Sequence, residues 1–136
     1  MNKVGLVTGG GSGIGKEISI SLAKHGIKTC VIDSDPLKGS ATTEHILKNG
    51  GESIFQLADV SNHQQIQNAI ASCVEIYGQL DIGVNNAGIG GARTLTHQYS
   101  EDDWNKVISI NLTGVWISMK YELSYMVPNQ SGTIVN

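Results

Sequence analysis

The sequence is poor in positive charge and in long apolar runs, and each shortage argues against a class of protein. Its 136 residues carry a formal net charge of -3 at pH 7 with a pI near 5.7, so no surplus of cations is available to attract nucleic acid or an anionic membrane. The first apolar run breaks at Gly9 and Gly10, which is typical of neither a signal peptide nor a membrane span. We therefore expect a cytoplasmic protein whose partners include neither nucleic acid nor a membrane.

Patterns that bind metals or form disulfides are also missing. The histidines are His25, His45, His63 and His97. They are dispersed without metal-ligand spacing, so no metal site is expected. The two cysteines, Cys30 and Cys73, stand far apart in separate apolar stretches and form no CxxC motif. We expect them to be reduced thiols in the core.

The remaining composition is that of an ordinary globular protein, with 40% hydrophobic and 15% charged residues. No linker, internal repeat or low-complexity tract interrupts the chain. A chain of this length suffices for one compact domain around one core. We expect residues 1–136 to form a single domain.

Short apolar runs alternate with segments of helical periodicity. Strands are expected at 3–10, 27–33, 52–60, 80–86 and 132–136, and helices at 13–25, 35–49, 61–77, from 100 onward and at 111–126. This alternation, with continuously apolar strands, predicts an α/β fold in which helices cover both faces of a parallel sheet. Right-handed crossovers make such a sheet doubly wound.

Local signals support the helices. Ile14, Ile18 and Leu22 recur at four-residue spacing in the first helix, and Ser61 with Gln64 forms a capping-box pair that would open the third. The third helix carries one apolar stripe, composed of Ile66, Ala69, Ile70, Cys73, Val74 and Tyr77. Both signals favour helices that pack one face on the sheet.

The last helix is apolar nearly all round, which is typical of burial on both sides. Val115, Met119, Leu123 and Met126 lie on one side, and Trp116, Ile117, Tyr121 and Tyr125 spread over the rest. We expect Trp104 and Trp116 to take part in core or interface packing.

The turn after the first strand is the strongest functional signal. Doubly wound sheets bind ligands beyond the carboxyl ends of their strands, and residues 8–15 read Thr-Gly-Gly-Gly-Ser-Gly-Ile-Gly. Glycines let the backbone turn tightly and approach a phosphate, whose charge is met by amide groups at the next helix N-terminus. The residues expected to bind are Thr8, Gly9, Ser12, Gly13, Ile14 and Gly15. A glycine-rich turn that binds no ligand stays as the alternative.

A second class of protein also matches this turn. Gly10–Lys16 fits the GxxxxGK of a nucleoside-triphosphatase loop. The next residue is Glu17, where that loop requires Ser or Thr to hold magnesium, and its carboxylate would face a triphosphate with the wrong charge. The sequence therefore disfavours a triphosphatase.

Asp33 ends the second strand, 18 residues after Gly15. An acid near this spacing accepts hydrogen bonds from the adenosine ribose of a dinucleotide, and its charge would repel the 2′-phosphate of NADP. The alternative is a turn residue ahead of Asp35-Pro36. The spacing favours NAD as the cofactor.

Taken together, the motifs resemble those of the short-chain dehydrogenase/reductase family over all 136 residues. The motifs are TGxxxGxG at 8–15, Asp59-Val60, Asn85-Asn86-Ala87-Gly88 and Asn111. The resemblance implies a Rossmann-type sheet, incomplete here with about five strands, a nicotinamide cofactor, and hydride transfer with a secondary alcohol or its ketone. Family members that use NADP place a basic residue where this chain has Ser12 or Ser34, so NADP is the less favoured cofactor.

The resemblance also assigns roles. Asp59 would face the adenine amino group and the Val60 amide a ring nitrogen, unless Asp59 is only a turn acid ahead of Ser61. Asn86, Ala87 and Gly88 would pass beside the adenosine ribose. Asn111 would interrupt a long helix and bind a water in the proton relay, unless it merely caps the helix.

The family's catalytic Tyr-x-x-x-Lys pair is absent, since no tyrosine has a lysine four residues later. The chain stops in the strand that leads, in the family, into the catalytic serine. We expect a truncated chain that carries the cofactor-binding half of an oxidoreductase and is inactive alone, the intact protein being a homodimer or homotetramer. The alternative is a short nucleotide-binding module without chemistry.

Overall fold

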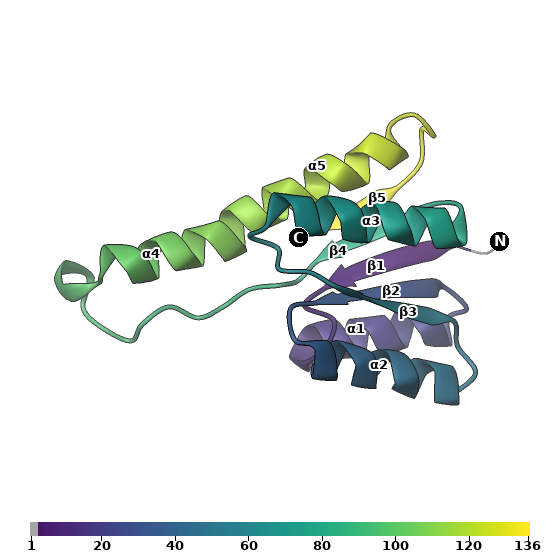
Figure 1. The fold of residues 1–136 in the computed structure, drawn as a ribbon, viewed down its shortest axis with the longest axis horizontal. Coiled ribbons are helices and arrows are strands. Elements are labelled where there is room, and N and C mark those ends of the chain that lie inside the picture. Colours follow the sequence, from purple (N-terminus) through teal and green to yellow (C-terminus); the bar gives the residue numbers. More distant parts are fainter. Residues whose placement is uncertain (1–2) are drawn as a thin grey trace.

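The computed structural model describes residues 3–136 and contains one parallel sheet with the order β3-β2-β1-β4-β5 (Figure 1). Its strands are β1 Val4–Thr8, β2 Lys28–Asp33, β3 Ser53–Leu57, β4 Ile82–Asn85 and β5 Thr133–Val135. The chain runs outward from β1 to β3 and then returns to the other side of β1 as β4. This reversal creates a topological switch point between β1 and β4. The predicted Rossmann-type α/β fold is confirmed.

Helices cover both faces of the sheet, as the alternation predicts (Figure 1). They are α1 Gly13–Lys24, α2 Pro36–Lys48, α3 His63–Tyr77, α4 Glu101–Ile108 and α5 Gly114–Met126. A short 3-10 helix, Thr96–Gln98, precedes α4. Helices α1 and α2 lie side by side on one face, while α3 and α5 pack together on the other. No helix among residues 3–136 is long and apolar enough to cross a membrane.

The main core lies between the sheet and the α3–α5 layer. The apolar stripe predicted for α3 is confirmed, because Ile66, Ala69, Ile70 and Cys73 are buried there and Val74 and Tyr77 pack against them. Cys30 of β2 joins the same cluster, and both cysteines are free thiols. A hydrogen bond with Cys73 raises the pKa of the Cys30 thiol, and burial raises it further. We therefore expect Cys30 to be a neutral, unreactive thiol.

The start of α3 differs from the capping-box prediction. Asn62, not Ser61, is the N-cap, and its side chain accepts from the Gln65 amide at 3.1 Å. Ser61 is engaged elsewhere, because its amide and hydroxyl both donate to Asp59. Two neighbouring residues could each cap the helix, and the turn at Asp59 decides between them.

The buried face of α1 is also not the one that Ile14, Ile18 and Leu22 mark. Ile14 is 75% exposed, whereas the buried residues are Gly15, Ser19, Ile20 and Ala23. A residue without a side chain is needed at Gly15, because a Cβ there would collide with the Gly9 carbonyl oxygen in the loop before α1. The four-residue spacing therefore predicted the helix correctly but not its packing.

The two helices expected on either side of Asn111 form one continuous rod. Between α4 and α5 lies a π-helical turn, Ser109–Thr113, so Asn111 neither begins nor caps a helix. The residues of α5 that face the core are Gly114, Ile117, Ser118, Glu122 and Met126. Leu123, which lies on the same side of α5 as Val115 and Met119, is 40% exposed. Trp104 and Trp116 are 60% and 55% exposed, so neither lies in the core of this chain. Interface packing, the other half of the expectation for these two residues, stays a prediction.

Candidate functional site

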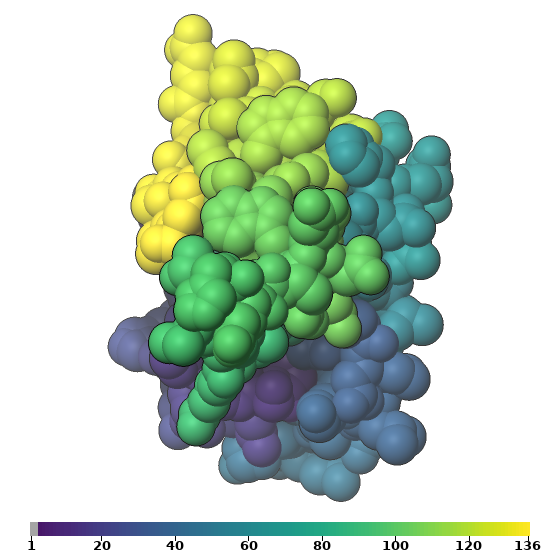
Figure 2. Space-filling model, turned by 90° about the vertical axis from the view of Figure 1, so that its left-hand side faces the viewer, coloured from purple at the N-terminus to yellow at the C-terminus, as the bar shows by residue number. Residues whose placement is uncertain are grey.

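A cavity of about 750 Å³ opens at the carboxyl ends of the strands, beside the switch point. Figure 2 views this end of the molecule, with the segment before α4 and α4 itself projecting toward the viewer. The predicted site residues on its wall are Gly9, Ser12, Gly13, Ile14, Asp33, Asp59, Val60, Asn86, Ala87 and Gly88. The other predicted site residues, Thr8, Gly15 and Asn111, do not line the cavity. Sequence reasoning missed Ser34, Asp35, Lys38, Ala58, Ile89 and Ile110 on the same wall.

The glycine loop is shaped by contacts that exclude side chains. Gly9 and Gly13 have positive φ angles of 65° and 53°, where glycine is favoured. A Cβ at Gly15 would collide with the Gly9 carbonyl oxygen and the Asn86 side-chain nitrogen, whereas a Cβ at Gly13 would enter open space. Gly15 therefore closes the loop, and Gly13 keeps the space above it clear.

The loop leads into the only one of helices α1–α4 that has no side-chain cap. Asp35, Asn62 and Ser100 cap α2, α3 and α4, whereas Ser12 makes no such bond at α1. The first amide groups of a helix point outward and carry the positive end of its dipole. At α1 these groups face a cavity, which is the arrangement that binds a phosphate.

The segment after β4 is tied directly to the glycine loop. The Asn86 side-chain nitrogen donates to the carbonyl oxygens of Thr8 at 3.1 Å and Gly9 at 3.3 Å, and the Ala87 amide donates to Thr8 Oγ1 at 3.1 Å. Thr8 and Asn86 thus fix two walls of the cavity relative to each other.

Asp33 is a turn residue and a cavity residue at once. Its Oδ2 accepts from the Gly11 amide at 2.8 Å and its Oδ1 from the Asp35 amide at 2.9 Å. Asp33 as a whole residue is 8% exposed and lies on the cavity wall. Each oxygen has a second lone pair, so the turn role leaves room for hydroxyl donors from a ligand.

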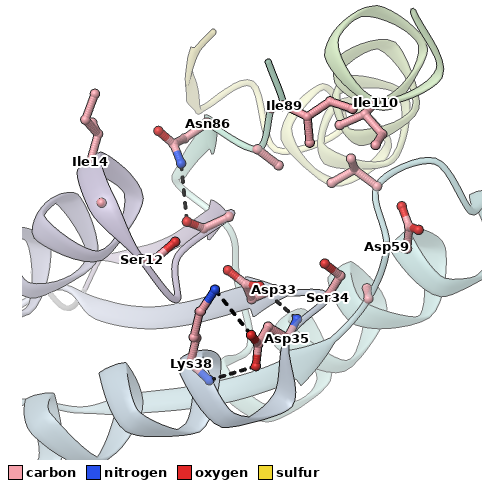
Figure 3. Close-up of a pocket in the computed structure, with 16 residues that line it drawn as sticks. Ser12, Ile14, Asp33, Ser34, Asp35, Lys38, Asp59, Asn86, Ile89 and Ile110 are labelled. Atoms are coloured by element: carbon pink, nitrogen blue, oxygen red, sulfur yellow. Dashed lines mark hydrogen bonds and ion pairs between the residues drawn. The ribbon is translucent and has the colours of Figure 1, made fainter. Parts of the chain in front are cut away.

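Asp35 and Lys38 stand beside Asp33 (Figure 3). Asp35 Oδ1 caps α2 by accepting from the amides of Leu37 at 3.0 Å and Lys38 at 3.1 Å. Its Oδ2 lies 3.4 Å from Lys38 Nζ. The hydrogen bond from the Lys38 amide is the main cause that lowers the pKa of Asp35. Desolvation opposes it with a smaller effect. The cavity therefore holds an ionised acid and a cation side by side.

Asp59 bounds the opposite side of the cavity. Its Oδ1 accepts from the Ser61 amide at 2.8 Å and the Ser61 hydroxyl at 2.7 Å, and its amide donates to Gln65 Oε1 at 2.8 Å. The turn role that the sequence left open is thus present. Asp59 also lines the cavity next to Val60. Its contact with the adenine of a bound cofactor remains a prediction.

Asn111 holds the chain after β4 by two hydrogen bonds. Its Oδ1 accepts from the Ile89 amide and its Nδ2 donates to the Ile89 carbonyl, both at 2.9 Å. The expected interruption of a long helix is confirmed by the π-helical turn around it. Its place in a proton relay remains a prediction.

A buried polar cluster joins β4, α5 and the end of β5 beneath the site. The Asn85 side-chain nitrogen donates to Glu122 Oε2 at 3.2 Å and to Asn136 Oδ1 at 2.9 Å. Glu122 is fully buried, and its Oε1 has no partner among residues 3–136. Desolvation raises the pKa of Glu122 to about 7, against a smaller opposing effect of the Asn85 bond. No sequence signal pointed to this carboxyl, because a lone glutamate on a helix normally faces water.

The sheet order, the switch-point cavity and the uncapped α1 place this chain among the Rossmann-like α/β domains. Comparison with known sequences is more specific, since the sequence model of the short chain dehydrogenase family matches residues 3–136. The chain belongs to this family. Among residues 3–136 no group of three or more His, Cys, Asp or Glu side chains is placed to hold a metal ion.

Individual relatives support this assignment. The chain is 37% identical over 136 residues to glucose 1-dehydrogenase 2 of Bacillus subtilis, covering 98% of this chain and 53% of the relative. It is 37% identical over 134 residues to a 3beta-hydroxysteroid dehydrogenase of Mediterraneibacter gnavus, covering 98% and 48%. The solved structure of NAD+-bound xylitol dehydrogenase superposes with a TM-score of 0.96 at 30% identity, covering 98% and 52%. The chain thus spans about half the length of these relatives, corresponding to their N-terminal part.

Proposed function

We propose that this chain is the NAD-binding part of an oxidoreductase that transfers hydride between a secondary alcohol and its ketone. The observation that carries the proposal is one cavity whose wall includes both the N-terminus of α1, which no side chain caps, and the Asp33 carboxylate. A dinucleotide has the matching order of groups, a diphosphate and then a ribose with two hydroxyls. The bound NAD+ solved in one relative belongs to that protein and supports the proposal by similarity.

The residues present fit this cofactor. Gly13 leaves open space above the α1 N-terminus, where a diphosphate would accept from the first amides of the helix. Asp33 would accept from ribose hydroxyls through its remaining lone pairs. Asp59 and Val60 would border the adenine, and Asn86, Ala87 and Gly88 the adenosine ribose. When bound, NAD supplies the hydride-accepting ring.

The rest of the reaction belongs to the whole protein and is proposed with it. Asn111 and Ile89 would hold the backbone near the reacting groups, and Asn111 would take part in the proton relay. An alcohol or ketone is the proposed partner, and the intact protein would be a homodimer or homotetramer. Because this chain has no Tyr-x-x-x-Lys pair, it should bind nucleotide without turnover. The same behaviour would be shown by the alternative, a binding module without chemistry.

The structure does not favour a nucleoside triphosphatase. Lys16, which would be the phosphate-binding lysine of GxxxxGK, is not on the wall of the cavity and lines a neighbouring shallow depression with Glu17. A lysine in that loop must reach the phosphates to act.

Titration of the chain with NAD and with NADP tests the proposal. Because Asp33 repels a 2′-phosphate, we expect NAD to bind at least about tenfold more tightly, a difference of about 1.4 kcal/mol. Isothermal titration calorimetry would measure both affinities, and Asp33→Asn should narrow the gap. Asp102→Asn, at an exposed position in α4, is the matched control. Equal or tighter binding of NADP by the wild-type chain would overturn the assignment of Asp33.

A further inference from the structure

The cavity wall holds one cation, and the usual sequence signals for NADP do not include it. Of the cavity-lining residues in the described part of the chain, only Lys38 carries a positive charge. It lies in the first turn of α2. The family resemblance places the basic residue of NADP-dependent members at Ser34, four residues earlier. The Lys38 side chain extends from α2 toward the carboxylates of Asp33 and Asp35 (Figure 3). Lys38 thus stands at the end of the cavity that Asp33 marks.

The base of Lys38 is fixed relative to the glycine loop. A Cβ on Gly11 would lie 2.8 Å from Asp33 Oδ2 and from the Gly39 amide nitrogen, and 2.9 Å from the Lys38 carbonyl carbon. The Gly11 carbonyl also accepts from Thr42 Oγ1 at 3.3 Å. The first turn of α2 is therefore packed directly on the loop, and only the outer part of the Lys38 side chain is free to move.

The ammonium group of Lys38 is weakly held. Within residues 3–136 its single ion pair is with Asp35 Oδ2 at 3.4 Å, and the two side chains are 60% and 38% exposed. Exposed pairs of this kind contribute little to stability. Asp35 Oδ1 is already engaged in capping α2. A stronger anion at this end of the cavity would therefore attract the ammonium at little cost.

We propose that Lys38 is a specificity-determining residue for the 2′-phosphate of the cofactor, and that it opposes the rejection of NADP by Asp33. The proposal rests on the assignment of the cavity as the dinucleotide site. A 2′-phosphate attached to the ribose beside Asp33 would lie within reach of the Lys38 side chain, which donates in up to three directions. The preference for NAD is thus a balance between an acid that repels the phosphate and a cation that attracts it.

Binding titrations on a set of variants of this chain test the proposal. The ligands are NAD, NADP, adenosine 5′-monophosphate and adenosine 2′,5′-bisphosphate, and the last two report on the adenosine end alone. Lys38→Met should weaken the binding of NADP about five- to tenfold more than the binding of NAD. It should weaken the binding of the bisphosphate by a similar factor relative to adenosine 5′-monophosphate. Lys38→Arg should keep the wild-type ratio, because the charge remains. Lys48→Met, at an exposed ion-paired lysine in the same helix, is the control and should change no ratio.

A double variant separates the two charges. Asp33→Asn should raise the relative affinity for NADP, and Asp33→Asn combined with Lys38→Met should lose most of that gain. Thermal unfolding and circular dichroism would show that each variant is folded. If Lys38→Met weakens the binding of both members of each ligand pair equally, or of neither, Lys38 does not recognise the 2′-phosphate. The inference then fails, while the assignment of the dinucleotide site is unaffected. If the wild-type chain binds none of the four ligands, the dinucleotide site fails and the inference with it.

Discussion

At the scale of single residues, the glycines of the 8–15 loop have two different roles. Gly15 is closed in by the Gly9 carbonyl oxygen and the Asn86 side chain, and Gly13 faces open space at a positive φ of 53°. The sequence motif gives both positions equal weight. Only the structure shows that one glycine is required for the loop to form and the other for a ligand to approach it.

Alanine substitutions should separate these roles. Gly13→Ala should cost about 1–2 kcal/mol in backbone strain and leave the chain folded, but nucleotide affinity should fall severely because the methyl group occupies the space of the diphosphate. Gly15→Ala should lower both stability and affinity, since the Gly9 carbonyl must move. Urea unfolding and calorimetric titration would measure the two quantities. Normal nucleotide binding by folded Gly13→Ala would show that the phosphate lies elsewhere.

Most site residues were predictable because strand ends and glycine-rich loops can be recognised from short stretches of sequence. Asp33, Asp59 and the Asn85–Gly88 segment each follow a recognisable strand, and parallel strands bring their carboxyl ends to one edge. Lys38 was not predictable in this way. Whether a lysine in the first turn of a helix faces a cavity or water depends on how that helix packs on the loop.

At the scale of helices and strands, α5 shows where periodicity misleads. The helix is rich in apolar residues on every side, so its pattern does not single out a face. The face that packs on the sheet includes Ser118 and Glu122. Gly83 makes this possible, because a Cβ there would meet the Glu122 carboxylate between 2.5 Å and 2.8 Å away. A polar residue in α5 is thus accommodated by a missing side chain in β4.

The buried carboxyl of Glu122 should make stability depend on pH. Its pKa is about 7 in the folded chain against an ordinary 4.5, so the folded state binds the proton more tightly than the unfolded state. The free energy of unfolding should therefore fall as pH rises from about 4.5 to about 7, by up to about 3 kcal/mol. Denaturant unfolding at several pH values would measure it.

Glu122→Gln should remove this part of the pH dependence, because glutamine is neutral throughout. Glu75→Gln, at an exposed position in α3, should behave like the wild-type chain. If the wild-type and Glu122→Gln chains lose stability in parallel between pH 4.5 and 7, the carboxyl is ionised over the whole range and the assignment of its pKa is wrong.

At the scale of the whole molecule, the layer order and the site position followed from the sequence alone. Alternating strands and helices specify a parallel sheet, and ligands of such a sheet are expected beyond the carboxyl ends of its strands. The sequence did not predict which apolar side chains lie on the outer surface. Several large apolar side chains of α4, α5 and the turns beside them are exposed: Trp104, Leu112, Trp116, Leu123 and Val127. An exposed apolar surface of this kind is typical of an interface.

The 136-residue chain should self-associate in solution. Besides the apolar surface along α4 and α5, β5 is hydrogen-bonded to β4 alone within residues 3–136, so it presents an unpaired edge. Sedimentation velocity over a range of concentrations would show species larger than a monomer. Trp116→Lys should reduce the association, with Lys24→Met on the opposite face of the sheet as the control. A well-behaved monomer at high concentration would show that neither surface drives assembly.

The hydrogen bonds between Asn86 and Thr8 also set an order of events during folding. They join residues 78 positions apart, and β1 must pair with β2 on one side and with the much later β4 on the other. Local contacts form faster than distant ones, because closing a long loop costs more chain entropy. On the ribosome the glycine loop is therefore made early but is braced only after Asn86 has emerged. The most conspicuous motif of the sequence is thus completed late, by a strand synthesised after both helices of the first layer.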